Sequence, residues 1–283
     1  MDNKRSTYII ATVAIVVIAA VVYFLFIFQK GPKQLKPQEV SGEVRQLSEI
    51  DIGKRPYVTL TPTSDGAEIL ISIENMSAFD RIEYELTYLA DNPQVSGEKI
   101  QRGSTGTDIN TKEAKYKKSI LLGTASRGVR SPDKGVTDGK LTTHFFKGDT
   151  EYFSETSWNF VQAGSTASTM QDASGKFKLE LYVLGKDYWI ILAETIGLPP
   201  GDKEFKAENV VLPVYGSFSV APKFTRDGKL LITLSNDVKN PQLYAYSNAD
   251  SKWTKLISNY DDSSKTISAT VNSFATFVAV SSK

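Results

Sequence analysis

Two features of the chain have residue types that could perform covalent or acid–base chemistry. Ser131 and Lys134 have the S-x-x-K spacing of serine acyl-enzymes of the penicillin-binding type, in which the lysine takes the serine proton. That chemistry needs the first turn of a helix, but Pro132 and Asp133 stand in a glycine-rich stretch. No S-D-N or K-T-G companion follows. His144, the single histidine, would suit a general base or pH switch, yet no nucleophile or second ligand stands at local spacing. We interpret the first motif as a surface turn and His144 as an ordinary strand residue, and we predict no catalytic residue.

Acidic and glycine-rich segments of the chain offer groups that could bind a metal ion or a cofactor. Residues 261–264, and Asn236 with Asp237 and Asn240, offer the oxygen ligands that calcium prefers, but neither group has carboxylates at alternating positions with a glycine at the bend. Turn chemistry is therefore favoured. Residues 103–106 and 164–166 lack the G-K-[ST] ending of a phosphate loop and are predicted to be flexible connections. With no cysteine in the chain, disulfides and thiolate metal sites are excluded, and we predict no metal and no cofactor.

Aromatic and basic residues give weaker indications of a binding surface. Trp158, Trp189 and Trp253 are candidates for stacking on the sugar rings of a glycan, although such rings more often fill the core of a sandwich. Residues 111–118 form the densest basic run after residue 55. Acidic glycans or lipid headgroups would suit it, but a solvated strand edge protected by lysines is favoured. The formal net charge of +1 argues against a nucleic-acid partner.

A long apolar run indicates that the chain is attached to a membrane. Residues 8–28 contain no charged residue, glycine or proline, and as a helix they would span about 30 Å, which matches the hydrocarbon core of a bilayer. A cleavable signal peptide would be shorter and would end in small residues, whereas Phe28 is followed directly by Gln29 and Lys30. We therefore predict a short N-terminal tail over residues 1–7 and an uncleaved transmembrane helix over residues 8–28.

The charges beside this run bear on orientation. Lys4 and Arg5 precede it, and Lys30, Lys33, Lys36 and Arg45 follow it. We expect the three lysines to contact lipid headgroups of the bilayer. A count of positive charges slightly favours a cytoplasmic C-terminal side, but long domains cross the membrane largely regardless of such charges. We expect a single-pass protein of the cell membrane with its C-terminal domains outside.

The remainder of the chain has the pattern of a β protein. Residues 29–55 are polar, contain Pro32 and Pro37, and are predicted to be a spacer; a short helix over residues 44–50 remains an alternative. After residue 56, short apolar or alternating runs are separated by Gly, Asp, Asn and Pro, which is typical of sandwiches and barrels. The strands expected from these runs cover residues 57–61, 69–73, 81–88, 119–124, 141–146, 152–161, 177–184, 188–193, 210–214, 218–224, 243–246, 253–256, 266–271 and 274–280.

An internal similarity suggests how these strands divide. Residues 63–75 and residues 225–236 share an Asp-Gly turn followed by an apolar strand, and a tyrosine-bearing strand follows each. Common architecture is favoured, with chance as the alternative, because Asp-Gly before an apolar strand is frequent. We therefore predict a mainly β fold, with a larger Ig-like β-sandwich domain over residues 56–213 and a smaller one over residues 214–283.

The C-terminal strands carry a resemblance to a known class of module. A tyrosine strand at residues 243–246 is followed by a W-x-x-L strand from Trp253, an alternating threonine strand at residues 266–271 and an F-x-T-F strand from Phe274. Over residues 218–280 this series resembles bacterial cell-surface Ig-like β-sandwich modules, and the whole chain resembles single-span bacterial surface proteins. The resemblance implies architecture and a surface setting only.

Together these features indicate a class of function. We expect a membrane-anchored, extracytoplasmic protein with a structural, adhesive or partner-binding role in the cell envelope, where its partner would be a protein or a glycan. The alternative is a cell-envelope hydrolase or carbohydrate-binding module whose site is assembled from distant loops.

Overall fold

The strands of this protein follow from period-2 alternation of apolar and polar residues. In Arg81–Asp91, for example, the even-numbered side chains are buried and the odd-numbered ones are half-buried or exposed, as a strand with one covered face requires. The computed structural model describes residues 42–235 and 237–281, and this part of the chain is mainly β. The expectation of a mainly β chain is therefore confirmed.

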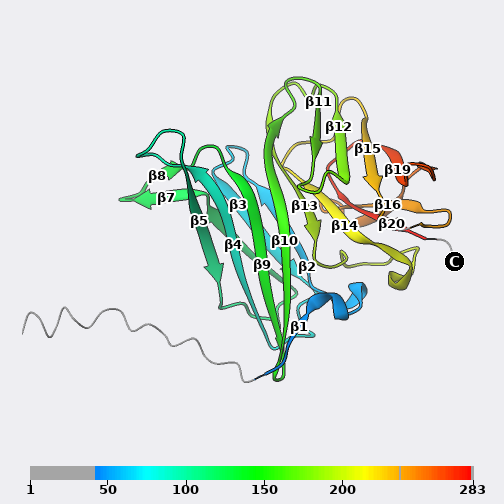
Figure 1. Ribbon diagram of the computed structural model, residues 1–283, viewed down its shortest axis with the longest axis horizontal. Helices are drawn as coiled ribbons and strands as arrows, with labels where there is room; N and C mark the ends of the chain where they lie inside the picture. The colour runs from blue at the N-terminus through cyan, green and yellow to red at the C-terminus, as the bar shows by residue number, and fades with distance from the viewer. Residues whose placement is uncertain (1–41, 236, 282–283) are drawn as a thin grey trace, which may run out of the picture. The chain divides into compact units, whose positions relative to one another are not determined.

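The described residues contain twenty strands and three short 3-10 helices. Figure 1 colours the chain from blue at its N-terminal end to red at its C-terminal end. The strands are β1 (Val44–Gln46), β2 (Tyr57–Pro62), β3 (Glu68–Glu74), β4 (Arg81–Asp91), β5 (Lys99–Gly106), β6 (Lys115–Leu121), β7 (Gly123–Ser126), β8 (Val129–Pro132), β9 (Thr137–Lys147), β10 (Thr150–Ala163), β11 (Ser168–Gln171), β12 (Phe177–Leu181), β13 (Tyr188–Thr195), β14 (Val210–Phe218), β15 (Gly228–Thr233), β16 (Gln242–Ser247), β17 (Lys252–Lys255), β18 (Ser258–Asp261), β19 (Thr266–Val271) and β20 (Thr276–Val280). The helices are η1 (Leu47–Glu49), η2 (Ile52–Lys54) and η3 (Ala207–Asn209).

One ten-stranded sheet runs through the whole folded unit. Its strand order is β17-β16-β20-β14-β13-β10-β9-β4-β5, and β1 adds to β10 in parallel. All of its other pairings are antiparallel. Two smaller sheets, β2-β3-β6 and β11-β12-β15-β19-β18, and the β7–β8 hairpin complete the strand pairing.

Each of the smaller sheets shares a core with part of the large one. Ile69, Ile71 and Ile73 of β3 belong to the same buried cluster as Leu86 of β4 and Phe145 of β9, so β2-β3-β6 covers the β4–β9–β10 part. We call this the first half. A second buried cluster joins strands of β11-β12-β15-β19-β18 to strands of the large sheet; it includes Phe177, Leu230, Ile267, Tyr215 and Phe277. We call this the second half.

The two cores lie on opposite faces of the shared sheet. In β13, Ile191 and Ala193 belong to the first core, whereas Ile190 and Leu192 belong to the second. Successive side chains of a strand point to opposite faces, so β13 serves both halves. A third cluster, which includes Val214, Val278 and Trp253, covers the face of β14, β16, β17 and β20 that the second core leaves open.

This arrangement differs from two independent domains that meet between residues 213 and 214. That boundary falls inside β14, which pairs with β13 on one side and β20 on the other. The second core also takes β11 and β12 from the region before residue 213. The two halves are therefore two sandwich-like units that share one large sheet. A hydrogen bond between the hydroxyl groups of Tyr57 on β2 and Thr276 on β20 connects them.

The end of the predicted spacer belongs to the folded unit. Residues Val44–Gln46 pair with Glu151–Phe153, and Leu47 is buried in the first core. This segment forms a strand and a 3-10 turn rather than the helix considered as an alternative, because β10 offers an open edge at this point. The predicted transmembrane helix over residues 8–28 and Lys30, Lys33 and Lys36 lie outside the described residues. Within residues 42–235 and 237–281, no helix is both long and apolar enough to cross a membrane.

Three local expectations need correction. Residues 103–106 are part of β5 and not a flexible connection: they pair with β4, and Gly106 leaves room for the ring of Tyr84 on that strand. Residues 219–224 form a loop after β14, in which Ser219 donates from its hydroxyl to the carbonyl of Trp189. Residues 119–124 contain the end of β6 and the start of β7.

The internal similarity corresponds to two strands with different pairing. Both β3 and β15 lie inside the smaller sheets, and the next strand of each, β4 and β16, joins the large sheet. However, β3 pairs with β2, the strand that precedes it, whereas β15 pairs with β12 and β19. The shared pattern therefore reflects a common local conformation within different sheet topologies.

Candidate functional site

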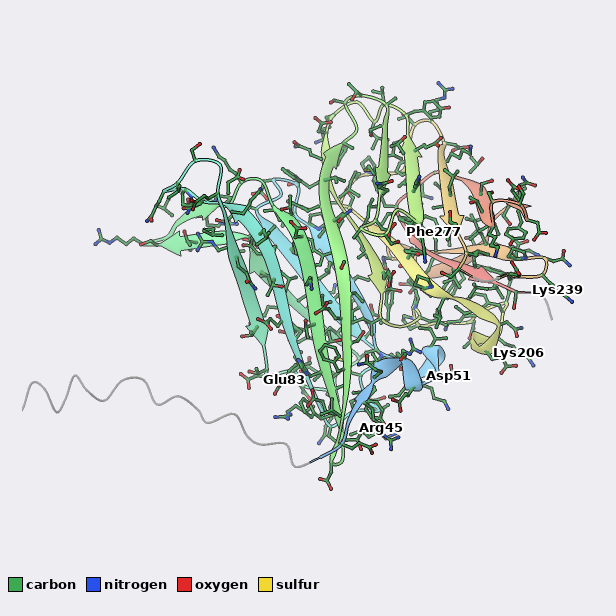
Figure 2. The ribbon with its side chains drawn as sticks, in the orientation of Figure 1. Arg45, Asp51, Glu83, Lys206, Lys239 and Phe277 are labelled. Atoms are coloured by element: carbon green, nitrogen blue, oxygen red, sulfur yellow. The ribbon has the colours of Figure 1, made fainter. Side chains whose placement is uncertain are left out.

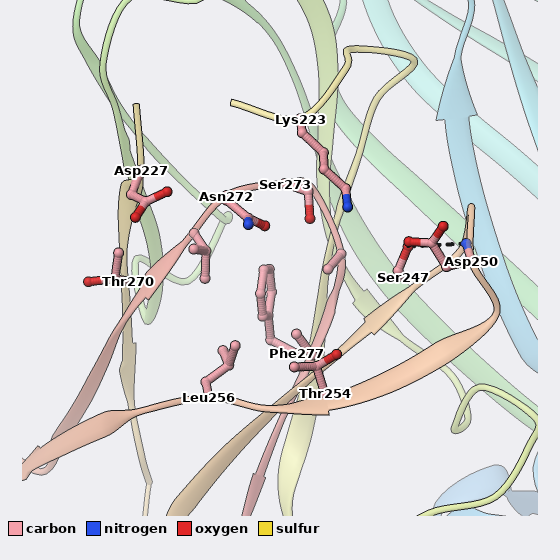
Figure 3. A pocket seen from close by; sticks show the side chains of 13 residues that line it. Lys223, Asp227, Ser247, Asp250, Thr254, Leu256, Thr270, Asn272, Ser273 and Phe277 are labelled. Atoms are coloured by element: carbon pink, nitrogen blue, oxygen red, sulfur yellow. Dashed lines mark hydrogen bonds between the residues drawn. The ribbon is translucent and has the colours of Figure 1, made fainter. Parts of the chain in front are cut away.

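Three loops meet at one end of the second half and surround a cavity of about 290 Å³. Lys223 and Asp227 come from the β14–β15 loop, Asp250 from the β16–β17 turn, and Asn272 and Ser273 from the β19–β20 loop. Figure 3 shows Lys223 with Asp227 on one side of it and Asp250 on the other. The rim thus offers one cation, two carboxylates, an amide and hydroxyl groups to a ligand.

The base of this cavity is apolar. Phe277 lies at its centre in Figure 3, and Leu256, Ala245, Val271 and Ala275 complete the apolar lining. Phe277 and Ala275 belong to the second core, so the base is rigidly packed. Polar and charged side chains make up most of the remaining lining, so the cavity combines a small apolar base with a largely polar wall.

A second cavity of about 370 Å³ adjoins the first. The two share Lys223, Ser247, Asp250 and Ser273, and the second continues to Thr61 of β2 and Phe218 of β14. We call the two cavities together the loop groove. It extends from the open end of the second half towards the first half.

Hydrogen bonds and ring contacts hold the three loops in place. The Ser247 hydroxyl donates to Asp250 Oδ2 over 2.9 Å and accepts from the Asp250 amide, which closes the β16–β17 turn. The Phe224 amide donates to the Asn272 carbonyl over 2.7 Å, and the rings of Phe224 and Phe274 meet edge to face at 4.9 Å. The groove is therefore a preorganised surface, which lowers the entropic cost of binding.

These side chains are suited to recognition. Lys223 would pair with an anionic group of a ligand, Asp227 and Asp250 with a cationic one, and Asn272 would both donate and accept. No protein-family model matches this sequence, and no curated protein is similar to it. The interpretation of the groove therefore depends on its own geometry.

The three tryptophans considered for glycan stacking occupy different environments. Trp158 is 1% exposed in the first core and lies over Gly139 of β9. Trp253 is 9% exposed and packs against Phe205 and Tyr246 in the third cluster. The rings of these two are covered by protein.

Trp189 is half-buried between two elements of the first half. Its ring stacks on Phe160 at 4.4 Å and lies over the Gly66 turn between β2 and β3. Its neighbours thus cover most of the ring, and the structure brings none of the three tryptophans into the loop groove.

His144 lies on the open face of β9, with Leu141, Thr143 and Phe145 directed to the core, as the alternation predicts. Its Nδ1 lies 2.6 Å from Glu151 Oε1 on β10, and its ring meets Phe153 edge to face. These contacts come from the next strand of a hairpin and indicate a structural cross-strand pair.

Ser131 and Lys134 do not have the geometry of an acyl-enzyme. Ser131 lies in β8, opposite Thr124, and Lys134 follows in a loop. Asp133 between them accepts a hydrogen bond from the Tyr88 hydroxyl at 2.9 Å and pairs with Arg102 at 3.5 Å. This segment anchors the β7–β8 hairpin to the first half.

The acidic segments considered for calcium form turns or surface pairs. Asp261 accepts hydrogen bonds from Ser263 and Ser264, and these bonds lower the pKa of its carboxyl group. Asp237 forms an ion pair with Lys265 at 2.7 Å. Asn236 lies outside the described residues. Among the residues that the structure does describe, no group of three or more histidine or acidic side chains is placed to hold a metal ion.

The basic run over residues 111–118 leads into β6, which is an edge strand of the β2-β3-β6 sheet. Lys117 and Lys118 are exposed along it, and Lys115 forms an ion pair with Glu74 at 2.5 Å. The prediction of a lysine-protected strand edge is confirmed.

Two acidic residues, the buried Asp172 and the half-buried Glu194, lie in the second half away from the loop groove. Asp172 is buried and accepts hydrogen bonds from the amides of Ser174 and Phe177, which close the β11–β12 turn. Burial raises the pKa of Glu194 on β13, and the charge of Asp172 raises it further, while Lys176 lowers it. Because the pKa of Glu194 is raised in the folded state, its ionisation opposes folding as the pH rises.

Sequence reasoning did not identify the residues of the loop groove. The sequence pattern marks Asp227 only as part of an Asp-Gly turn, and it places Lys223 inside a predicted strand. The available signal is that Asp250 and Asn272 each stand in a short polar segment between apolar strands, whereas Lys223 lies between Pro222 and Phe224 and has no such signal. Which of several such segments meet in space depends on the pairing of the strands.

Proposed function

We propose that the chain is a membrane-anchored protein of the cell envelope that holds an Ig-like β-sandwich unit outside the cell membrane and binds a partner through the loop groove. The observation that carries the binding role is the pair of adjoining cavities that share Lys223, Ser247, Asp250 and Ser273. Loops at the end of a rigid sandwich are a common place for recognition, since the sheets fix them while the loop residues remain free to vary.

The chemistry of the groove supports a partner with charged and apolar groups. A cation and two carboxylates at the rim would orient a polar segment of an envelope protein or a glycan, and the apolar base around Phe277 would contact a side chain or the apolar face of a sugar. The alternative assignment, a hydrolase or carbohydrate-binding module, would use the same groove.

The membrane placement is supported by the sequence. Residues 8–28 have the length and composition of a spanning helix, and Lys30, Lys33 and Lys36 would contact anionic headgroups of the bilayer. The folded unit begins close behind this segment, at Gly42. A surface-exposed β unit on a single-span anchor is consistent with an adhesive or partner-binding role.

The absence of native cysteine provides a clean test of membrane orientation. We would introduce Ser157→Cys on the exposed part of β10 in one variant and Asn3→Cys in the N-terminal tail in another. A membrane-impermeant maleimide added to intact cells should label Ser157→Cys and leave Asn3→Cys unlabelled until lysis. The opposite pattern would place the folded unit in the cytoplasm and refute this part of the proposal.

The binding role is tested by site-specific cross-linking. A photoreactive residue in place of Asn248, which lines the second cavity, should capture a defined partner in intact cells, and the same residue in place of Ser157 should not. Lys223→Glu should abolish the cross-link, whereas Lys178→Glu on β12 makes the same charge change outside the groove and should preserve it. A cross-link that survives Lys223→Glu would refute the assignment of the groove.

A further inference from the structure

A separate cavity lies where the chain enters the folded unit. It has a volume of about 280 Å³ and is lined by η1–η2, the β3–β4 turn and the β9–β10 hairpin. Its apolar wall consists of Ile50, Ala78, Phe79 and Tyr152. Two lysines also line it: Lys54 at the end of η2 and Lys147 at the end of β9. We call it the entry cavity.

Side-chain hydrogen bonds and a ring contact fix the walls of the entry cavity. The Arg55 guanidinium donates to the carbonyls of Ile50 at 2.7 Å and Ser48 at 3.0 Å, which fixes η1 and η2. The Asn75 amide side chain donates to the Arg55 carbonyl, which ties the β3–β4 turn to the same segment. The rings of Phe79 and Tyr152 meet edge to face at 6.4 Å.

The acidic residues near the entry cavity form their hydrogen bonds and ion pairs with groups other than Lys54 and Lys147. Glu43 and Glu49 both pair with Arg45, Asp51 accepts from the Gly53 amide, and Asp80 accepts from the Gly148 amide. Asp149 is exposed in the hairpin but does not line the cavity.

Within residues 42–235 and 237–281, neither lysine has an ion-pair partner within 4.0 Å. An apolar wall with two available ammonium groups fits an amphiphile with an anionic headgroup.

The position of the entry cavity indicates which amphiphile would reach it. The Glu151 amide donates to the Glu43 carbonyl, so the chain enters the fold beside the hairpin that carries Lys147 and Tyr152. Figure 2 labels Arg45 and Asp51 at this end of the unit. Residues 29–41 can span at most about 45 Å when fully extended, which limits the distance between this end and a membrane-embedded anchor.

We propose that the entry cavity binds one anionic phospholipid, with the phosphate group between Lys54 and Lys147 and the beginning of an acyl chain against Ile50, Phe79 and Tyr152. This inference rests on the proposed membrane anchoring. In this proposal, the bound lipid holds the end of the folded unit that contains the entry cavity against the bilayer. The loop groove, which lies in the second half, is not part of this lipid site.

The test is native mass spectrometry of the full chain in dodecyl maltoside, with water-soluble dioctanoyl lipids as probes. Dioctanoyl phosphatidylglycerol should bind at one site, at least about tenfold more tightly than dioctanoyl phosphatidylcholine. Lys54→Gln with Lys147→Gln should weaken phosphatidylglycerol binding by about 30-fold, as expected for the loss of two lysines at a lipid surface. Lys178→Gln with Lys229→Gln removes two exposed lysines of the second half and should leave binding unchanged.

A variant that keeps the charges tests the apolar wall separately. Ala78 is exposed at the cavity, so Ala78→Trp should fill the space without affecting the core and should abolish lipid binding. Equal binding of the two lipids, or unchanged binding by either cavity variant, would overturn the proposal. Displacement of phosphatidylglycerol by millimolar inorganic phosphate would also overturn it, since the site would then recognise free phosphate alone.

Failure of this inference can be told apart from failure of the proposed function. Extraction of cell membranes with alkaline carbonate reports on the anchor by itself. If the chain stays in the membrane pellet but shows no lipid selectivity, only the lipid site is refuted. If carbonate releases the chain, the anchor is refuted whatever the mass spectra show.

Discussion

The hydroxyl of Tyr57 joins the two halves of the molecule, and its removal should measurably destabilise the fold. Tyr57 on β2 is 1% exposed, and its hydroxyl lies 2.6 Å from Thr276 Oγ1 on β20 and donates to Asn248 Oδ1 at 3.1 Å. Thr276 is itself 0% exposed. Tyr57→Phe keeps the ring and its edge-to-face contact with Tyr246 but leaves the Thr276 hydroxyl without this partner.

The expected cost follows from these contacts. A typical buried hydrogen bond contributes about 1 kcal/mol, and a partner left unsatisfied in the interior costs about 1–3 kcal/mol. We therefore expect Tyr57→Phe to lower the free energy of unfolding by about 2 kcal/mol. For a folded unit of this size, this corresponds to a decrease in Tm of about 4–8 °C.

The assay is urea unfolding of the full chain in dodecyl maltoside, followed by tryptophan fluorescence. Thr276→Val in the Tyr57→Phe background should cost less than the sum of the single changes, by about 1 kcal/mol, because the orphaned hydroxyl is removed. Tyr260→Phe is the matched control, because its buried hydroxyl has no hydrogen-bond partner among the described residues, so its removal breaks no hydrogen bond and should not lower the free energy of unfolding. A Tyr57→Phe effect as small as that of the control, or strict additivity with Thr276→Val, would refute the reasoning.

Two further predictions concern the cores. Gly139→Ala should destabilise the first half by about 1–3 kcal/mol in the same urea assay, because the added methyl group would collide with the buried ring of Trp158; Ser157→Ala, at an exposed position beside it, should be neutral. Glu194→Gln should raise Tm at pH 7, because burial and Asp172 raise the pKa of Glu194 in the folded state and its ionised form opposes folding. This gain should diminish as the pH falls towards the ordinary pKa of a glutamate, where the carboxyl group is protonated in both states; a gain independent of pH between 4 and 7 would contradict the assignment. Thermal unfolding across this pH range provides the measurement.

Local patterns predicted many of the strands but not how they pair. The alternation at residues 81–88 and 141–146 depends only on one face of each strand being buried, so β4 and β9 could be recognised directly. The pattern does not predict β5, because glycines have low strand propensity; Gly106 is tolerated because the ring of Tyr84 occupies the space that a side chain would fill. The loop after β14 was predicted as a strand because its apolar residues resemble one.

The candidate site was less predictable than the strands. Lys223, Asp250 and Asn272 are separated by more than twenty residues along the chain at each step, and none belongs to a motif. They meet because β14, β16 and β20 are neighbours in the large sheet while β15 and β19 are neighbours in the smaller one. Strand order is a property of long-range pairing, which single-sequence periodicity does not report.

The amino-acid sequence by itself determined the strand-rich character of the chain, the polar outer faces of its strands, and an apolar run long enough to cross a bilayer, since each depends on neighbouring residues alone. Only the tertiary structure decided that β13 serves two cores on opposite faces of one sheet. It also decided that residues 44–55 belong to the fold and that three distant loops form a groove. These features depend on which strands pair, because residues far apart along the chain contribute together to each core and each cavity.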